Sequence, residues 1–382
     1  MVESATNPPP AVFDAWIDPL PDDADDALAI HVKHQTLLRA YQARYVVLPS
    51  ETPTGSILDH FARHYDEDRL QRLGALKPGL EAELIAPLQA AARAASGDGD
   101  VLAYVERLLP ELRAAAGDAF LEALVEAPQR EHHYRNFLLQ SSADLLAEAS
   151  ASALGIIGEF GPPQSALFRI LIDEFGFGSH DRKHSVLYRA TMRSFGLVDE
   201  YNHYSRLFDT NTLVLHNAIH GLFQNPRNLF QQVGFLLFAE TAYQRSTLFH
   251  QRHLNRFHPQ ADARYFAEHA HIDLHHTRMV VEEVVTPLVA RFGPEIGREI
   301  ITGAELTRAV FARAGAGQLA LVAAFDAAPS AAFGLGDHGG PAVTPGARVA
   351  DAAARVQIGA IGSVSAGDFA HFPAGAFGRV AA

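Results

Sequence analysis

Two histidines and an aspartate stand at helical spacing in the segment YFAEHAHIDLHHTRM, namely His269, Asp273 and His276. Positions i, i+4 and i+7 of an α-helix project within a wedge of roughly 60° on one face. Two imidazoles and a carboxylate on one face form a ligand set suited to iron, manganese or zinc. The alternative is a solvated helix face in a chain rich in histidine. We favour a metal site, because four further residues extend the set.

These four residues are Glu148, Glu174, His184 and Glu240. Glu240 lies in the middle of VGFLLFAETAYQ, where a lone carboxylate costs several kcal/mol unless it is paired or metal-bound. Glu174 ends the helix of ALFRILIDEFGFG, and His184 opens the next helix. Glu148 lies on an apolar stripe, with a surface glutamate as the alternative. The seven residues together suit two metals that share carboxylates, as in bundle proteins whose helices project Glu and His inward.

The composition narrows the chemistry. The chain has 382 residues, 48% of them hydrophobic and 20% charged, as expected of a soluble globular protein. It has no cysteine, which excludes disulfides, thiolate ligands and cysteine nucleophiles, so any metal must be held by His, Asp and Glu. A formal net charge of -13 argues against nucleic acid or an anionic membrane as the main partner. We find no secretory signal or membrane-spanning run and expect a cytoplasmic protein.

Apolar residues at three- and four-residue spacing predict an all-α protein. Residues 1–23 are predicted to be an irregular leader, and 24–126 a helical accessory region with breaks at PSETPTG, LKPG and SGDGD. Residues 127–326 are predicted to form the main domain, and 327–382, rich in Ala and Gly, a low-complexity tail or lid. Short connections between long amphipathic helices favour an antiparallel bundle. Its helices are expected near residues 129–158, 163–175, 181–196, 202–222, 228–256, 262–290 and 293–315.

In this order the candidate residues resemble those of the haem-oxygenase-like diiron oxidases and oxygenases. The similarity covers about residues 128–315, and the ligand spacing is most similar to that of the amine N-oxygenase branch. The resemblance is carried by Glu148, the Asp173-Glu174-Phe-Gly-Phe-Gly turn, His184 with the following Leu-Tyr-x-x-Thr-Met, Glu240, and His269-x-x-x-Asp273-x-x-His276.

The resemblance has consequences for the fold, the cofactor and the assembly. It implies a haem-oxygenase-like helical bundle without haem, in which the seven residues hold two Fe2+ ions. It also implies activation of O2 through a peroxo-diiron intermediate. In the N-oxygenase branch a helical N-terminal region is linked to dimerisation, so a homodimer formed through residues 24–126 is expected.

The leading functional hypothesis is an O2-dependent non-haem diiron monooxygenase of specialised metabolism. It would oxygenate the nitrogen of a small-molecule amine or amino-acid-derived substrate, with electrons from an external donor such as a reductase. One alternative is a diiron oxidase that performs C–H desaturation or C–C fragmentation of an amino or fatty acid. Another is a non-catalytic metal-binding interaction protein. True haem oxygenase is disfavoured, because it leaves three core glutamates without a purpose.

Further residues are assigned supporting roles. Asp173, Tyr188 and Tyr265 are candidates for outer hydrogen bonds that would orient the ligands. Arg193 and Arg245 could bind a substrate carboxylate, although surface salt bridges are favoured for both. The remaining histidine pairs are expected in the core or in outer contacts of the site (His216 and His220) or on the surface (His31 and His34, likewise His60 and His64). Beside the main motif, His271 points away from the metal-binding face and His275 lies at its edge.

Overall fold

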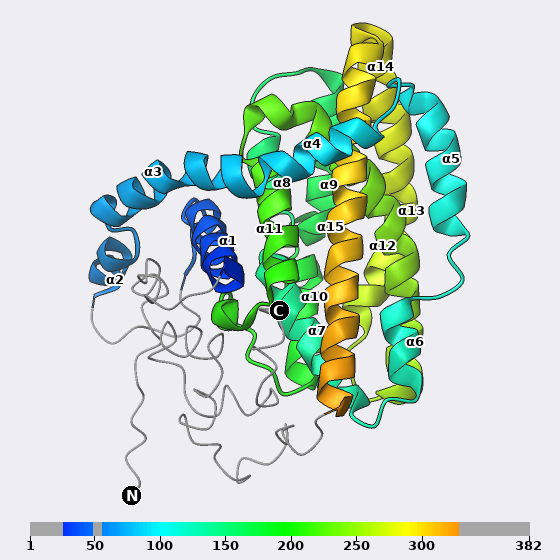
Figure 1. The fold of residues 1–382 in the computed structure, drawn as a ribbon. Coiled ribbons are helices and arrows are strands. Elements are labelled where there is room, and N and C mark those ends of the chain that lie inside the picture. The colour runs from blue at the N-terminus through cyan, green and yellow to red at the C-terminus, as the bar shows by residue number, and fades with distance from the viewer. Residues whose placement is uncertain (1–25, 49–55, 328–382) are drawn as a thin grey trace, which may run out of the picture.

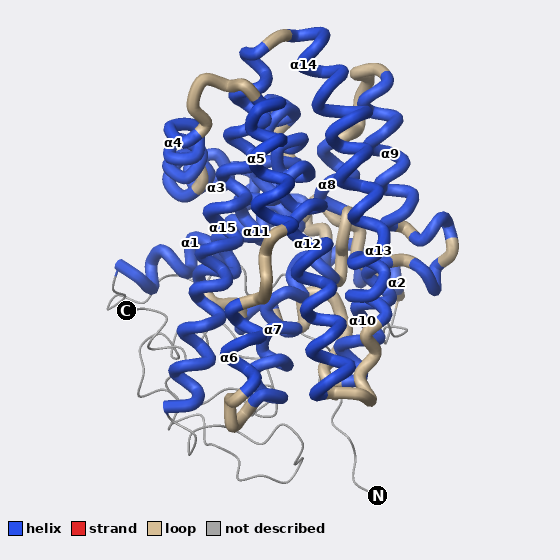
Figure 2. Tube along the Cα trace, turned by 90° about the vertical axis from the view of Figure 1, so that its right-hand side faces the viewer, coloured by secondary structure: helices blue, strands red, loops and turns tan. Residues whose placement is uncertain are grey.

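The computed structural model describes residues 26–48 and 56–327, and within these two ranges every regular element is a helix (Figures 1 and 2). The all-α fold predicted from the sequence is confirmed. The expected leader (1–23) and the expected tail (327–382) lie outside the described residues, apart from Ala327 at the end of the last helix. Among the described helices, none combines the length and the apolar character needed to cross a membrane.

The main bundle is built around α12 (Leu229–Phe257), which packs most extensively against α15 (Pro294–Ala327) and α13 (Arg264–Met279). Figure 1 shows these long helices upright, with α11 (Thr210–Phe223) beside α15. The other elements of the bundle are α7 (Arg130–Leu145), α8 (Ser150–Gly155), α9 (Pro162–Glu174), α10 (His184–Ser194), α14 (Thr286–Phe292), the π-helical segment η5 (Val280–Val285) and the short 3-10 turns Gly176–Gly178, His180–Arg182, Ser205–Leu207 and Pro226–Asn228.

A glycine in each of two central helices permits their close approach. A Cβ atom at Gly234 of α12 would lie 1.9 Å from the carbonyl oxygen of Ile300, and one at Gly303 of α15 would lie 1.9 Å from the carbonyl oxygen of Gln231. Neither position has room for a side chain, so the two backbones are in direct contact. This contact fixes α12, the helix that carries Glu240, against the longest helix of the bundle.

The accessory helices cover the bundle and share its core. Figure 1 shows α4 crossing the upright helices, and α4 packs against α15. Val101 and Leu108 of α5 belong to the same buried apolar cluster as Val284 and Ile300 of the bundle. The bounds of the accessory helices are α1 (Asp26–Gln42), α2 (Ile57–His64), α3 (Glu67–Leu84), α4 (Ala86–Ala95), α5 (Val101–Arg113) and α6 (Ala119–Val125).

Several helix bounds in the bundle differ from those expected. The helix expected over 129–158 is interrupted after α7, where Ala149 has a φ of 64°, a left-handed conformation that a right-handed helix cannot contain. The helix expected over 202–222 begins at Thr210, because Asp209 accepts hydrogen bonds from the first backbone N–H groups and caps it. The segment 262–290 is divided between α13, η5 and α14, and α15 extends well beyond 315.

The expected break at LKPG is wrong, because α3 continues through Pro78. Contacts on both sides of Pro78 hold the helix together. Leu73 is buried against α1, and the hydroxyl of Tyr41 in α1 donates to Glu81 at 2.7 Å. Tertiary packing therefore outweighs the local cost of a proline in a helix. The expected break at SGDGD is confirmed between α4 and α5.

Candidate metal centre

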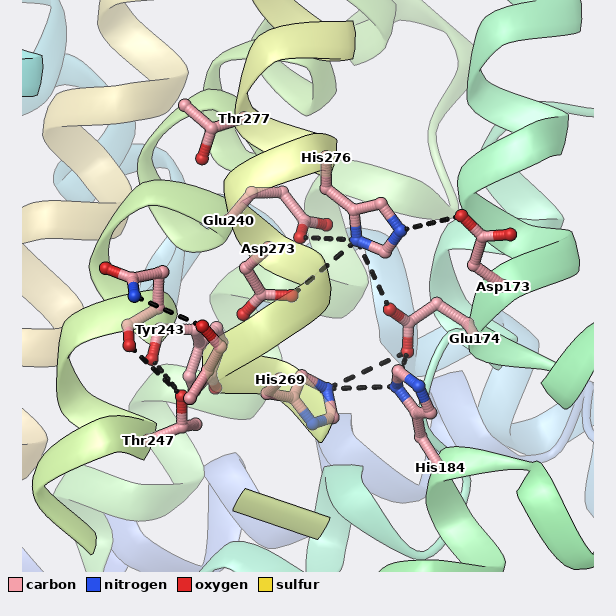
Figure 3. A network of polar contacts seen from close by, with 12 residues as sticks. Asp173, Glu174, His184, Glu240, Tyr243, Thr247, His269, Asp273, His276 and Thr277 are labelled. Carbon is pink, nitrogen blue, oxygen red and sulfur yellow. Dashed lines mark hydrogen bonds and ion pairs between the residues drawn. The ribbon is translucent and has the colours of Figure 1, made fainter. Parts of the chain in front are cut away.

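The seven candidate residues, spread over more than a hundred positions, gather in the middle of the bundle (Figure 3, which labels all of them except Glu148). They come from five separate places in the chain. Glu148 lies in the turn after α7, Glu174 ends α9, His184 opens α10, Glu240 lies on α12, and His269, Asp273 and His276 share one face of α13. The three residues on α13 are buried and His271 is exposed, as the spacing predicted, and His275, expected at the edge of the face, is exposed as well.

A tight turn brings Glu174 and His184 together. Gly176 has a φ of 69°, and a Cβ atom there would lie 2.5 Å from the backbone nitrogen of Lys183. Only glycine fits this close approach, which folds the start of α10 back onto the end of α9. As a result Nδ1 of His184 lies 2.7 Å from Oε2 of Glu174.

A first group of ligand atoms consists of Glu148, Glu174, His184 and His269, whose atoms all lie within 4.8 Å of one another. Nε2 of His269 lies 3.3 Å from Oε1 of Glu148 and 3.1 Å from Nδ1 of His184. Two imidazoles and two carboxylates converging in this way could hold one transition-metal ion.

A second group consists of Glu174, Asp273 and His276, again within 4.8 Å of one another. Nδ1 of His276 lies 3.7 Å from Oε1 of Glu174 and 3.6 Å from Oδ1 of Asp273. Glu240 is outside this group, but its Oε2 lies 3.1 Å from the same Nδ1. Glu174 thus belongs to both groups and turns one oxygen to each, as a carboxylate shared by two metals would.

The donor set fits a pair of cations. Neither oxygen of the fully buried Asp273 has a hydrogen-bond partner, and Oε2 of Glu148 also lacks one. Within the described residues, every ion-pair partner of the four carboxylates of Glu148, Glu174, Glu240 and Asp273 is a histidine. Uncompensated buried carboxylates are costly, and two divalent ions would neutralise four of them.

Outer hydrogen bonds orient the imidazoles. Nδ1 of His269 lies 3.0 Å from the carbonyl oxygen of Tyr265; because a carbonyl only accepts, this nitrogen carries the proton and Nε2 is left to face the carboxylates. Nε2 of His276 lies 3.1 Å from Oδ2 of Asp173. The Tyr265 hydroxyl donates to Glu148 at 2.7 Å. Tyr188 instead donates to a backbone carbonyl, that of Leu138.

The carboxylates control the protonation of the metal-free site. Burial opposes a charge on His276, but the nearby carboxylates, Glu240 foremost, raise the pKa of His276 to about 11. The pKa of His269 is also raised well above its usual value, because Glu148 and Asp273 outweigh burial. Burial raises the pKa of Asp273 to about 7. Without metal, bound protons neutralise part of the negative charge that metal ions would otherwise neutralise.

Sequence reasoning missed Asp144, four residues before Glu148 on α7. Asp144 lines a small cavity of about 70 Å³ that exposes several candidate ligands, and also a larger one of about 470 Å³. Burial, with Glu148 and Glu174, raises the pKa of Asp144 to about 7. The available signal was the i, i+4 spacing from Glu148, which would place both carboxylates on one face of the helix expected over 129–158.

Most of the other histidine pairs singled out in the sequence are buried. His216 and His220 are buried, as expected of core residues. His31 and His34 were expected on the surface but are buried, because α1 packs against α11 and each ring contacts a polar side chain there, Thr210 or Asn217. His64 is buried as well, so its expected exposure is also wrong; the side chain of His60 lies outside the described residues.

The two arginines considered for a substrate carboxylate, for which surface salt bridges were favoured, do not line the cavities. Arg193 pairs with Asp199 on the surface, which agrees with the favoured salt-bridge role. Arg245 donates to the backbone carbonyl of Ala115 at 2.7 Å. Neither lines the cavity of about 70 Å³ or that of about 470 Å³.

Replacing Asp173 with asparagine is expected to weaken metal binding by about 10- to 100-fold, because Asp173 fixes the orientation of His276. The fold should be unaffected, since asparagine has the same shape. Competition with a metal-binding dye measures the affinity, and Asp181→Asn, in an exposed turn of the same region, is the control. Equal affinities of the two variants would contradict the orienting role.

The segment that carries this centre is similar to known proteins. Residues 135–312 match the model of a family described as iron-containing redox enzymes. The chain is also 38% identical, over 188 residues, to a nitrosourea synthase of Streptomyces achromogenes subsp. streptozoticus. The match covers 48% of this chain and 39% of that relative, so the chain spans about two fifths of the relative's length. Residues 135–312 are therefore similar to the iron-containing redox enzymes, which agrees with the resemblance that the ligand pattern implied.

Proposed function

We propose that this protein is an O2-dependent non-haem diiron oxygenase that oxygenates the nitrogen of a small-molecule amine or amino-acid-derived substrate. The observation that carries the proposal is the carboxylate of Glu174, whose two oxygens face two separate groups of imidazoles and carboxylates. The relative's name, nitrosourea synthase, supports nitrogen as the atom that is oxidised.

The proposed reaction is balanced with one external reductant. An amine R–NH2, O2, two electrons and two protons give R–NHOH and water, so one N–O bond forms and the O–O bond breaks. Two Fe2+ ions, when bound, would supply the reducing equivalents that bring O2 to the reactive level. The electrons are restored by a donor such as a reductase.

The protein's own residues would position the metals and keep the reaction away from water. Glu148, His184 and His269 would hold one ion, Asp273, His276 and Glu240 the other, and Glu174 both. Asp173 and Tyr265 would keep the ligands oriented. The apolar wall of the small cavity, which includes Leu167, Ile170, Leu171, Phe235 and Leu236, excludes bulk water.

We also propose that the protein forms a homodimer through the accessory helices of region 24–126 and works in the cytoplasm. A chain lacking that region would sediment as a monomer if the proposal holds. If the truncated bundle exposes too much core to fold, cross-linking of the full chain in dilute solution gives the oligomeric state directly. A monomeric full chain would refute the dimer.

The test of the oxygenase is anaerobic loading with Fe2+ followed by mixing with O2. We expect about two irons per chain, a transient visible absorption after mixing, and faster decay of that absorption when a suitable amine is present. A chain that binds a single iron, or that never consumes O2 with any member of a broad amine panel, contradicts the proposal. A fatty acid that accelerates the decay in place of amines would favour the C–H oxidation alternative.

Metal binding at neutral pH is expected to release protons. The raised pKa values of His269 and His276 keep both imidazoles protonated in the metal-free protein, and a metal binds only the neutral ring. Loading with Zn2+ should therefore release about two to three protons per chain at pH 7, two from the imidazoles and part of one from Asp273, and the affinity should fall as the pH falls. Calorimetry in buffers of different ionisation enthalpy counts the protons. His276→Gln should release about one fewer, and release of none by the unaltered chain would contradict the charge arrangement.

A further inference from the structure

A cavity of about 470 Å³ lies next to the candidate metal centre. Its wall comes mainly from α7, α11, α12 and α15. Asp144, Ile219 and Tyr243 line both this cavity and the small one that exposes the candidate ligands. Figure 3 shows Tyr243 and Thr247, which line the larger cavity, beside the candidate ligands. A molecule in the larger cavity could therefore reach the metals past these three residues.

The cavity carries negative charge and no positive charge. Among the described residues that line it, the only charged side chains are those of Asp118 and Asp144, and none is Lys or Arg. Two histidines in the wall do not change this, because burial lowers the pKa of His216 and of His250 to about 4 and keeps both neutral.

The two aspartates differ in what they contact. The side chain of Asp118 accepts a hydrogen bond from the backbone N–H of Leu121 and caps α6. The side chain of Asp144 has no hydrogen-bond or ion-pair partner among the described residues. It is half-buried and lies where the two cavities meet. A carboxylate in this position, enclosed by apolar residues such as Phe137, Leu215 and Phe311, is a site for a cation.

We propose that this cavity binds an organic cation, that Asp144 is the residue that pairs with its charged nitrogen, and that the cavity selects against substrates whose carboxylate must be buried. This proposal rests on the proposed function, because it narrows the substrate named there to an amine with an apolar body. A free amino acid would bring a carboxylate into a wall without a basic partner, which costs desolvation with no compensating ion pair.

The test uses four six-carbon probes with the full chain, loaded with Fe2+ and kept without O2 so that no turnover occurs. The probes are hexylamine, hexanol, hexanoate and 6-aminohexanoate, at about pH 8 so that the amine and Asp144 are both charged. Calorimetry should give binding of hexylamine at least about tenfold tighter than that of hexanol. Hexanoate and 6-aminohexanoate should bind more weakly than hexylamine.

Two matched variants show which carboxylate pairs with the charged nitrogen of the ligand. Asp144→Asn should abolish the preference for hexylamine over hexanol, a loss of about tenfold or more. Asp118→Asn removes the other negative charge and keeps the helix cap, since asparagine also caps, and it should retain most of the preference. Asp144→Ser serves in the same way if Asp144→Asn does not fold.

Three outcomes would overturn the proposal. They are an unchanged preference in Asp144→Asn, an equal loss in Asp118→Asn, and binding of hexanoate or 6-aminohexanoate as tight as that of hexylamine. The same titrations on the metal-free chain separate this proposal from the oxygenase. A chain that fails to hold two irons but still prefers hexylamine through Asp144 would sink the oxygenase alone.

Discussion

Replacing Glu174 with glutamine is expected to leave the protein folded but unable to hold a pair of metals, and to lower oxygen consumption at least about a hundredfold. The reason is the position of the carboxylate, which is the one candidate ligand common to both groups. An amide has a single oxygen with lone pairs and no charge, so it cannot serve two metals. Iron per chain and the initial rate of O2 uptake are the measurements.

Loss of the shared ligand should remove more iron than loss of an unshared one. Glu148→Gln alters one group and should leave metal at the other, so its iron content should fall by about half, whereas Glu174→Gln should affect both. Glu282→Gln, an exposed glutamate at the start of η5, is the matched control and should retain full iron and activity. If Glu174→Gln binds two irons with unaltered affinity, the shared carboxylate is not a ligand.

Much of the candidate centre could be predicted because its geometry is local. The face of α13 follows from the period of the helix, so no tertiary information is needed to place His269, Asp273 and His276 on one face and His271 away from it. Glu240 was identifiable for a related reason, since a carboxylate among consecutive apolar residues must have a partner. The sequence alone does not state which partner, and here it is His276.

The features that sequence reasoning missed depend on contacts between distant segments. His31 and His34 lie in a helix that looks polar, yet α1 packs on α11 and buries both rings. Continuation of α3 through Pro78 likewise depends on α1. Asp144 has an ordinary helical position, and its importance arises only because two cavities meet beside it. The local sequence pattern predicts the helices, but tertiary packing determines which of their side chains are buried.

The second large effect concerns stability in place of activity. Replacing Asp273 with asparagine is expected to stabilise the metal-free protein by about 1–4 kcal/mol at neutral pH, because burial disfavours the charged form of this carboxylate and raises its pKa to about 7. The same change should abolish most of the stabilisation that metal gives, since ligands that bind only the folded state stabilise it by mass action. Urea unfolding with and without Zn2+ measures both effects.

The pH dependence of the stability difference between Asp273→Asn and the native chain tests whether the buried charge of Asp273 causes it. Burial raises the pKa of Asp273 to about 7 in the folded protein, against about 3.9 in an unfolded chain. The folded state therefore binds more protons than the unfolded state between these values, and the metal-free protein loses stability as the pH rises from about 4 to about 7. Asparagine does not titrate, so the advantage of the variant should be small at about pH 4 and largest above about pH 7.

The remaining charges limit the size of this gain and supply a check on it. His269 and His276 lose one counter-charge in the variant, but Glu148, Glu174 and Glu240 still neutralise them. The net effect thus stays positive, because three carboxylates still face the two protonated imidazoles. Asp181→Asn, at an exposed position, should show neither the gain nor its pH dependence. A metal-free Asp273→Asn chain less stable than the native one at every pH would mean that Asp273 is held by a favourable contact, and the case for a site built to receive cations would fail with it.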